Sequence, residues 1–280
     1  MSIKDIQSRE TVSCALTTSG KIYCWGKNDQ HQLDVPESTR FDSMSVGNSH
    51  VCGVTVSRQL LCWGDNSAGQ LTPVQDQSGD VIQVSAGWNN TCAIFVDNGL
   101  RCWGWNPYQA MTVPTFNRSV QFVDNNGTHV CAVLQGGTVT CWGANNFGQL
   151  NVPPDLPPAK SVALHGAFSC AIDIADQVRC WGANDHGQSA VPSDLGAVKQ
   201  LALGGWLGCA LLIDQRVRCW GGNNGYPVPF STAARYDLIS YSHLGSGYDG
   251  VYGCAVVGLN ISCSGNNSPV LNAPDIEQPP

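Results

Sequence analysis

The sequence predicts an all-β protein that folds as a seven-bladed β-propeller, with one disulfide-linked hairpin in each blade. Three observations predict this fold. The 14 cysteines form seven pairs at a regular period, short runs of β-forming residues alternate with turn residues, and 31 glycines and 15 prolines accompany only 12% charged residues. Many short strands joined by tight turns have this composition. A single all-β domain often reaches this length, so residues 1–280 are predicted to form one propeller domain.

The cysteine spacing sets the limits of the blades. The first members of successive pairs lie 38, 40, 39, 39, 39 and 45 residues apart. Periods of this size are found in propeller blades and in some helical arrays. The approximate limits of the predicted blades are residues 1–38, 39–77, 78–116, 117–155, 156–194, 195–233 and 234–280.

Each unit contains the same elements in the same order. The unit that contains Cys92 begins with a β-forming run, Val81–Val84, which is too short for a helix. A hairpin follows, formed by Cys92–Val96, the turn Asp97–Gly99 and Leu100–Trp103. Because no helical period occurs and each unit supplies three or four short strands, we expect a closed ring of sheets and not a helical solenoid.

The two cysteines of a pair face each other across the predicted hairpin, where opposed side chains are roughly 4.5 to 5.5 Å apart. A disulfide can close at that distance. Zinc is the alternative, although its cysteine ligands usually come as pairs separated by two to four residues. The predicted disulfides are Cys14–Cys24, Cys52–Cys62, Cys92–Cys102, Cys131–Cys141, Cys170–Cys180, Cys209–Cys219 and Cys254–Cys263.

Composition also limits where the protein works and what it binds. Disulfides persist in oxidising compartments, so we expect an extracellular protein or one of the secretory pathway, although residues 1–10 lack the apolar core of a signal peptide. The net charge of −7 argues against a nucleic-acid partner, because phosphate contacts need a basic surface. No apolar run approaches the roughly 20 residues that span a bilayer, so membrane insertion is not expected. A monomer is expected.

The sequence shows no catalytic motif. It lacks His-Glu-x-x-His, Gly-x-Ser-x-Gly, a phosphate-binding glycine loop before a helix, and an aspartate-rich calcium loop. His50 and His129 both stand two residues before the first cysteine of their units, and a repeated position favours a structural role over a catalytic one. We therefore expect no enzyme activity, no cofactor and no metal.

The repeat itself resembles a known family. Cys-Trp-Gly-x-Asn-x-x-Gly-Gln-Leu with a following Val-Pro is similar to the regulator-of-chromosome-condensation repeat superfamily, and closest to the propeller-type β-lactamase inhibitor proteins. Trp-Gly stands at residues 25/26, 63/64, 103/104, 142/143, 181/182 and 220/221, and Ser264-Gly265 replaces it in the last unit. The paired cysteines also resemble plant crinkly-type receptor ectodomains. The resemblance implies a seven-bladed ring. Members of the superfamily bind a small GTPase and chromatin, a bacterial enzyme, or unknown ligands.

Aromatic residues mark a candidate binding face. The tryptophans of the Trp-Gly pairs repeat identically and are predicted to fill the space between blades. Trp88 and Trp206 are outside this pattern, in the loop between the first strand and the hairpin. Aligning the units places these loops and the Gly-x-Asn loops at one rim. The predicted binding residues are Trp88, Tyr108, Phe147, Phe168, His186, Trp206, Tyr226, Tyr248 and Tyr252.

These residues lead to a hypothesis of protein recognition. Interface cores are enriched in Tyr, Trp and Phe, so we expect a non-enzymatic module that binds a protein partner with one propeller face. In the inhibitor proteins that the repeat resembles, the same loops carry the aromatic contacts, which implies steric occlusion of a partner. A lectin that stacks sugars on these rings is the alternative, and guanine-nucleotide exchange or scaffolding is the third hypothesis. A fourth interpretation is ring packing without any partner.

The last unit carries a longer loop over residues 241–250. Projecting loops on a rigid scaffold often carry binding residues. The alternative is that this glycine-rich insertion only accommodates closure of the ring.

Overall fold

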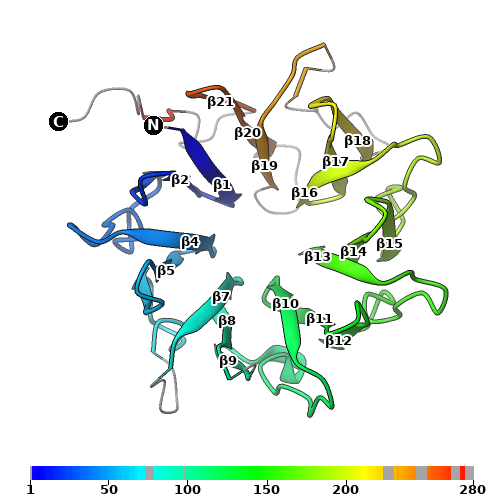
Figure 1. The fold of residues 1–280 in the computed structure, drawn as a ribbon, viewed down its shortest axis with the longest axis horizontal. Coiled ribbons are helices and arrows are strands. Elements are labelled where there is room, and N and C mark those ends of the chain that lie inside the picture. The colour runs from blue at the N-terminus through cyan, green and yellow to red at the C-terminus, as the bar shows by residue number, and fades with distance from the viewer. Residues whose placement is uncertain are drawn as a thin grey trace.

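The computed structural model describes residues 2–72, 79–97, 99–222, 230–231, 233–243, 251–265 and 272–274. It contains seven three-stranded antiparallel sheets, the blades, arranged in a ring and numbered here 1 to 7 along the chain (Figure 1). The strands are β1 (Ile3–Arg9), β2 (Val12–Thr17), β3 (Ile22–Gly26), β4 (Phe41–Val46), β5 (His50–Thr55), β6 (Leu60–Gly64), β7 (Val81–Ala86), β8 (Asn90–Phe95), β9 (Leu100–Gly104), β10 (Val120–Asn125), β11 (His129–Leu134), β12 (Val139–Gly143), β13 (Ala159–His165), β14 (Phe168–Asp173), β15 (Val178–Gly182), β16 (Val198–Gly204), β17 (Leu207–Leu212), β18 (Val217–Gly221), β19 (Leu238–His243), β20 (Val251–Val257) and β21 (Asn260–Gly265).

Each blade is one continuous stretch of chain. Its first strand lies at the centre of the ring, and the second and third strands follow outward (Figure 1). The prediction of an all-β, seven-bladed propeller is confirmed. Among the described residues the only helical segment is a short 3₁₀ turn, Pro107–Gln109. The same residues include no helix that is long and apolar enough to cross a membrane.

The cysteine pairs close one hairpin in each blade. Cys14 lies opposite Cys24 in the register of β2 and β3, and the corresponding residues are opposed in all seven blades. All seven predicted disulfides are present, with Cα atoms 4.0 to 4.1 Å apart. The zinc alternative is wrong, because every cysteine sulfur is bonded to another cysteine sulfur.

Seven apolar clusters hold the ring together, one between each pair of neighbouring blades. The repeated tryptophans belong to these clusters and are nearly fully buried, as predicted. Trp103 of blade 3 packs against blade 2, and its indole N–H donates to the carbonyl of Gln70 at 2.9 Å. The same bond to the preceding blade is made by Trp63, Trp142, Trp181 and Trp220.

An Asn and a Gln that recur in blades 1, 2, 4 and 5 shape the loop that follows the third strand. In blade 4, the side chain of Asn145 accepts the backbone N–H of Leu150 at 3.0 Å. The buried side chain of Gln149 accepts the N–H of Phe147 at 2.9 Å, while its carbonyl receives the indole of the next blade. The repeat residues are therefore structural, and the positions between them are free to vary.

The Trp-Gly pair ends the third strand with a glycine in the left-handed region. These six glycines have φ between 91° and 113°. A Cβ on Gly143 would lie 2.5 Å from the carbonyl oxygen of Thr128. Only glycine allows the strand end to approach the neighbouring loop this closely.

Blade 7 meets blade 1 to close the ring. β19 packs beside β1, and the cluster between them contains Ile6, Trp25 and Tyr252. The hydroxyl of Tyr252 donates to the carbonyl of Val12 at 3.4 Å. Closure among the described residues therefore uses side-chain packing between two complete sheets. The long loop of the last unit lies mostly outside the described residues, so neither interpretation of it is tested.

Candidate binding face

Two sets of loops gather on one face of the ring. The first and third strands of a blade both run antiparallel to the second strand, so they end at the same edge of the sheet. We call this edge the loop face. It comprises the loops between the first two strands, at 10–11, 47–49, 87–89, 126–128, 166–167 and 205–206, and those after the third strands, at 27–33, 65–71, 105–111, 144–150 and 183–189.

Exposed aromatic side chains lie on the loop face of blades 3 and 4. Trp88 is 38% exposed, Trp105 43%, Tyr108 60% and Phe147 56%. Large rings with this exposure present apolar area to solvent that a partner could cover. Half-buried aromatic side chains continue the series in blades 5 and 6.

The loop after β9 departs from the repeat. Where blade 4 has Gly148 with φ 77°, blade 3 has Gln109 with φ 60°, and the preceding Tyr108 has φ 53°. The structural glutamine of the repeat is replaced by Ala110. Two successive non-glycine residues in the left-handed region cost about 1 kcal/mol or more each. The sequence of this loop therefore accepts backbone strain while it exposes Trp105 and Tyr108.

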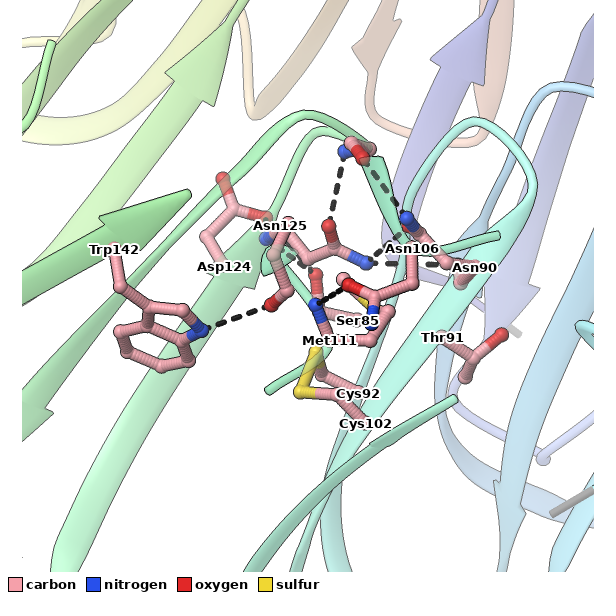
Figure 2. The surroundings of a disulfide bond; sticks show 12 residues. Ser85, Asn90, Thr91, Cys92, Cys102, Asn106, Met111, Asp124, Asn125 and Trp142 are labelled. Atoms are coloured by element: carbon pink, nitrogen blue, oxygen red, sulfur yellow. Dashed lines mark hydrogen bonds between the residues drawn. A yellow bond between two sulfur atoms is a disulfide. The ribbon is translucent and has the colours of Figure 1, made fainter. Parts of the chain in front are cut away.

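A network of buried amides holds the loops beside the two exposed tryptophans of blade 3. The side chain of Asn90 donates to the carbonyls of Trp105 at 2.8 Å and Gly127 at 2.9 Å. Asn125 of blade 4 donates to the side-chain oxygen of Asn90 at 2.9 Å and accepts the N–H of Gly127 at 2.9 Å (Figure 2). Both asparagines are fully buried. These hydrogen bonds hold the loops of two neighbouring blades in fixed positions.

Trp88 lies against the loop of the next blade. A Cβ added to Gly127 would stand 2.9 Å from the Cβ of Trp88, and Gly127 has φ 109°. Both the close approach and the positive φ require glycine at this position. The rigid loop of blade 4 thereby limits the positions open to the Trp88 ring.

Two of the predicted residues stack on each other. The rings of His186 in blade 5 and Trp206 in blade 6 are 4.2 Å apart between centroids, with planes 20° from parallel. The loop that carries Trp206 is fixed by its neighbour, since Gly205 N–H donates to Nδ1 of His165 at 3.0 Å. Trp206 also packs against the apolar cluster between blades 6 and 7, which makes it part of the core as well as of the loop face.

His50 and His129 connect blades. Nε2 of His50 lies 3.0 Å from the hydroxyl of Thr91, and that hydroxyl donates to the carbonyl of Gln70 at 2.9 Å. Because the hydroxyl hydrogen is used, Nε2 must carry the hydrogen and donate. Burial lowers the pKa of His50 to about 3, with a smaller contribution from Arg9, and burial alone lowers the pKa of His129 to about 3. Both imidazoles are neutral at ordinary pH.

Four segments, residues 13–32, 41–70, 81–109 and 126–149, match the model of the regulator of chromosome condensation (RCC1) repeat. The part of the chain within residues 13–149 therefore contains segments that match the RCC1 repeat. No curated protein sequence matches it.

Solved structures share the fold. The ectodomain of the receptor kinase CR4 from Physcomitrella patens superposes with a TM-score of 0.77 at 21% identity, over 93% of this chain and 72% of that one. The CRINKLY ectodomain of ACR4 from Arabidopsis thaliana superposes with a TM-score of 0.76 at 21% identity, over 96% of this chain and 97% of that one. Prp20p from Saccharomyces cerevisiae superposes with a TM-score of 0.69 at 13% identity, over 78% of this chain and 72% of that one. That structure is described with the binding of Prp20p to Gsp1p and histones. The resemblance to β-lactamase inhibitor proteins stays a prediction.

Two predicted binding residues of this propeller are not on the surface. Phe168 is 1% exposed and Tyr252 0%, so the prediction that they face a partner is wrong. Phe168 begins β14 and Tyr252 is the second residue of β20, and both are middle strands of a blade. Middle strands have neighbouring blades on both faces, which buries every side chain of β14. Tyr226 and Tyr248 lie outside the described residues.

The sequence prediction also missed Trp105. It is outside the Trp-Gly repeat, and that was a usable signal. Its position between the glycine and the asparagine of the repeat holds Lys27, Asp65, Ala144 and Ala183 in other blades. The position thus varies freely, and the structure places the Trp105 side chain in solvent.

Proposed function

We propose that the protein is a non-enzymatic binding module that holds a protein partner against the aromatic side chains of its loop face. The observation that carries the proposal is the loop after β9. This loop has replaced two structural residues of the repeat, contains Tyr108 and Gln109 in the left-handed region, and exposes two aromatic rings. Strained backbone that the surrounding structure holds in place is concentrated at functional sites.

The support beneath the rings favours tight recognition. Asn90 holds the backbone carbonyl of Trp105 without any partner present. Asn90 and Asn125 together hold Gly127, the residue against which Trp88 lies. A preformed surface loses little conformational entropy on binding, so more of the contact energy appears as affinity. Aromatic residues that are central and rigid are the usual hot spots of interfaces.

The pattern of rings favours one protein over repeated sugars. Blades 3, 4, 5 and 6 present Trp105 with Tyr108, Phe147, His186 and Trp206, so no two blades offer the same site. A lectin with sugars stacked on Trp88 and Trp105 is the second candidate, favoured by the exposure of these two indoles. Nucleotide exchange, which the namesake repeat suggests, has less support, because seven disulfides indicate an oxidising compartment. We accordingly propose an extracellular or secretory location.

The experiment uses the oxidised protein as bait in extracellular extracts and, in parallel, on a glycan array. A double variant, Trp105→Ala with Tyr108→Ala, removes the exposed rings of one loop. Its matched control is Ile174→Ala with Val56→Ala, because these side chains are 70% and 69% exposed and lie at the other edge of the sheets, in the turns between second and third strands.

We expect a stoichiometric protein partner that binds the wild type and the control but not the double variant. Glycan binding that free sugar competes away would instead make the protein a lectin. A partner that the control variant loses and the double variant keeps would overturn the assignment of the loop face.

A further inference from the structure

The centre of the ring contains a channel that the binding face does not use. Its cavity has a volume of about 460 Å³ and is lined by the first strands of the blades. Ligand sites commonly have volumes of this size. Parts of its wall are closed by side chains that bond to the next blade, as Gln83 does with the N–H and carbonyl of Val123 and Gln200 does with those of Ile239.

A guanidinium group lines the channel at its loop-face end. Arg9 is the last residue of β1, and its Nη1 donates to the carbonyl of Ala86 in blade 3 at 3.3 Å, passing over blade 2. This is the only hydrogen bond that the Arg9 side chain makes to the described residues. A guanidinium has five N–H donors, and Arg9 lines the cavity with four of them without a hydrogen-bond partner among the described residues. Burial lowers the pKa of Arg9, opposed by the charge of Asp124.

A carboxylate enters the same end of the channel from blade 4. One oxygen of Asp124 accepts the Ser85 hydroxyl at 3.0 Å and the N–H of Asn125 at 2.9 Å (Figure 2). The other oxygen, Oδ2, accepts the N–H of Leu164 at 2.8 Å and no second hydrogen bond from the residues that the structure describes. Burial raises the pKa of Asp124 and the charge of Arg9 opposes that rise. The two charged groups are not in contact, since no nitrogen of Arg9 lies within 4.0 Å of the carboxylate.

The charges limit the ligand. A simple anion bound to Arg9 would be repelled by Asp124, and a simple cation bound to Asp124 would be repelled by Arg9. A ligand with a negative and a positive group, oriented head to tail between them, meets an opposite charge at each end. The guanidinium offers parallel N–H donors that suit a carboxylate, and Oδ2 of Asp124 retains an acceptor site for an ammonium hydrogen.

We propose that the loop-face end of the channel binds a free α-amino acid, with its carboxylate on Arg9 and its ammonium group on Asp124. This site is separate from the exposed aromatic rings. It goes beyond the proposed function and does not depend on it, because Arg9 and Asp124 line the channel and the exposed aromatic rings do not.

The test is isothermal titration of the oxidised protein with each of the common L-amino acids. For any that binds, the N-acetylated and the amidated forms are titrated as well, since each removes one of the two charges. Arg9→Gln and Asp124→Asn remove the two protein charges in turn, and Arg9→Lys keeps the charge without the parallel donors. Asp5→Asn is the matched control, because Asp5 lines the same channel four residues before Arg9, about 13 Å along an extended strand.

At least one amino acid is expected to bind, and either blocked form is expected to bind about tenfold more weakly or worse. Arg9→Gln and Asp124→Asn should each weaken binding by a similar factor, Arg9→Lys should weaken it less, and Asp5→Asn should leave it unchanged. Arg9→Lys keeps the test valid if a charge-removing variant fails to fold. Absence of heat with every amino acid at millimolar concentration would overturn the proposal, as would equal binding of the blocked forms.

Discussion

Acid should destabilise the protein because two buried histidines resist protonation in the folded state. The variant His50→Asn removes the contribution of one of them. The pKa of His50 and His129 in the folded protein is about 3, against 6.5 for the ordinary side chain. As the pH falls below 6.5 the unfolded chain binds protons that the folded protein cannot, so stability is full above 6.5 and is lost progressively toward 3. At about 1.4 kcal/mol per pH unit, each histidine removes about 2 kcal/mol by pH 5.

The assay is urea unfolding at pH 7 and pH 5 of the wild type and His50→Asn. Asn90 occupies the equivalent position in blade 3, which shows that the ring tolerates asparagine there. Other groups titrate in both proteins, including Asp124, whose raised pKa acts in the opposite direction, and they cancel in the comparison. The variant should lose about 2 kcal/mol less than the wild type between the two pH values. Equal losses would refute the claim that His50 stays neutral in the folded ring.

Three further variants test the packing. Cys52→Ala with Cys62→Ala opens one hairpin loop and should lower the free energy of unfolding by about 2 to 3 kcal/mol in urea, without loss of the other six blades. Gly127→Ala should lower the melting temperature and change the near-ultraviolet signal of Trp88, because its Cβ would lie 2.9 Å from that side chain in a left-handed backbone that costs about 1 to 2 kcal/mol. Trp206→Ala should lower stability by about 2 kcal/mol, whereas Trp88→Ala should cost about 1 kcal/mol or less, and equal melting temperatures for the two would contradict their different packing.

The ring could be predicted from the sequence because cysteine spacing reports strand register. Opposed cysteines ten residues apart require a hairpin, and the first strand and the loops follow from its position. The period of the pairs then gives the number of blades. These features are local, so they depend little on how the blades pack.

The binding face could be predicted only in part, because burial depends on neighbouring blades. Aligning the units places Phe168 beside His50 and Asn90, two residues before a cysteine, and all three are buried in middle strands. An aromatic residue at this position fills space between blades. The hydrophobic pattern of the sequence alone does not distinguish such a buried aromatic residue from an exposed one. Trp206 belongs to both the core and the loop face. It packs against the apolar cluster between blades 6 and 7, and its ring also stacks on His186 of blade 5. Both contacts depend on neighbouring blades.

Oxidative footprinting of the protein with and without its partner would test the central claim most directly. Solvent-generated radicals modify exposed side chains of both faces, and modification is read residue by residue with mass spectrometry. Protection of Trp88, Trp105 and Tyr108, with unchanged modification of Ile174 and Ile213 in the turns at the opposite edge, is the predicted result. Protection of the two isoleucines with full modification of the three aromatic rings would show that the partner binds the other face.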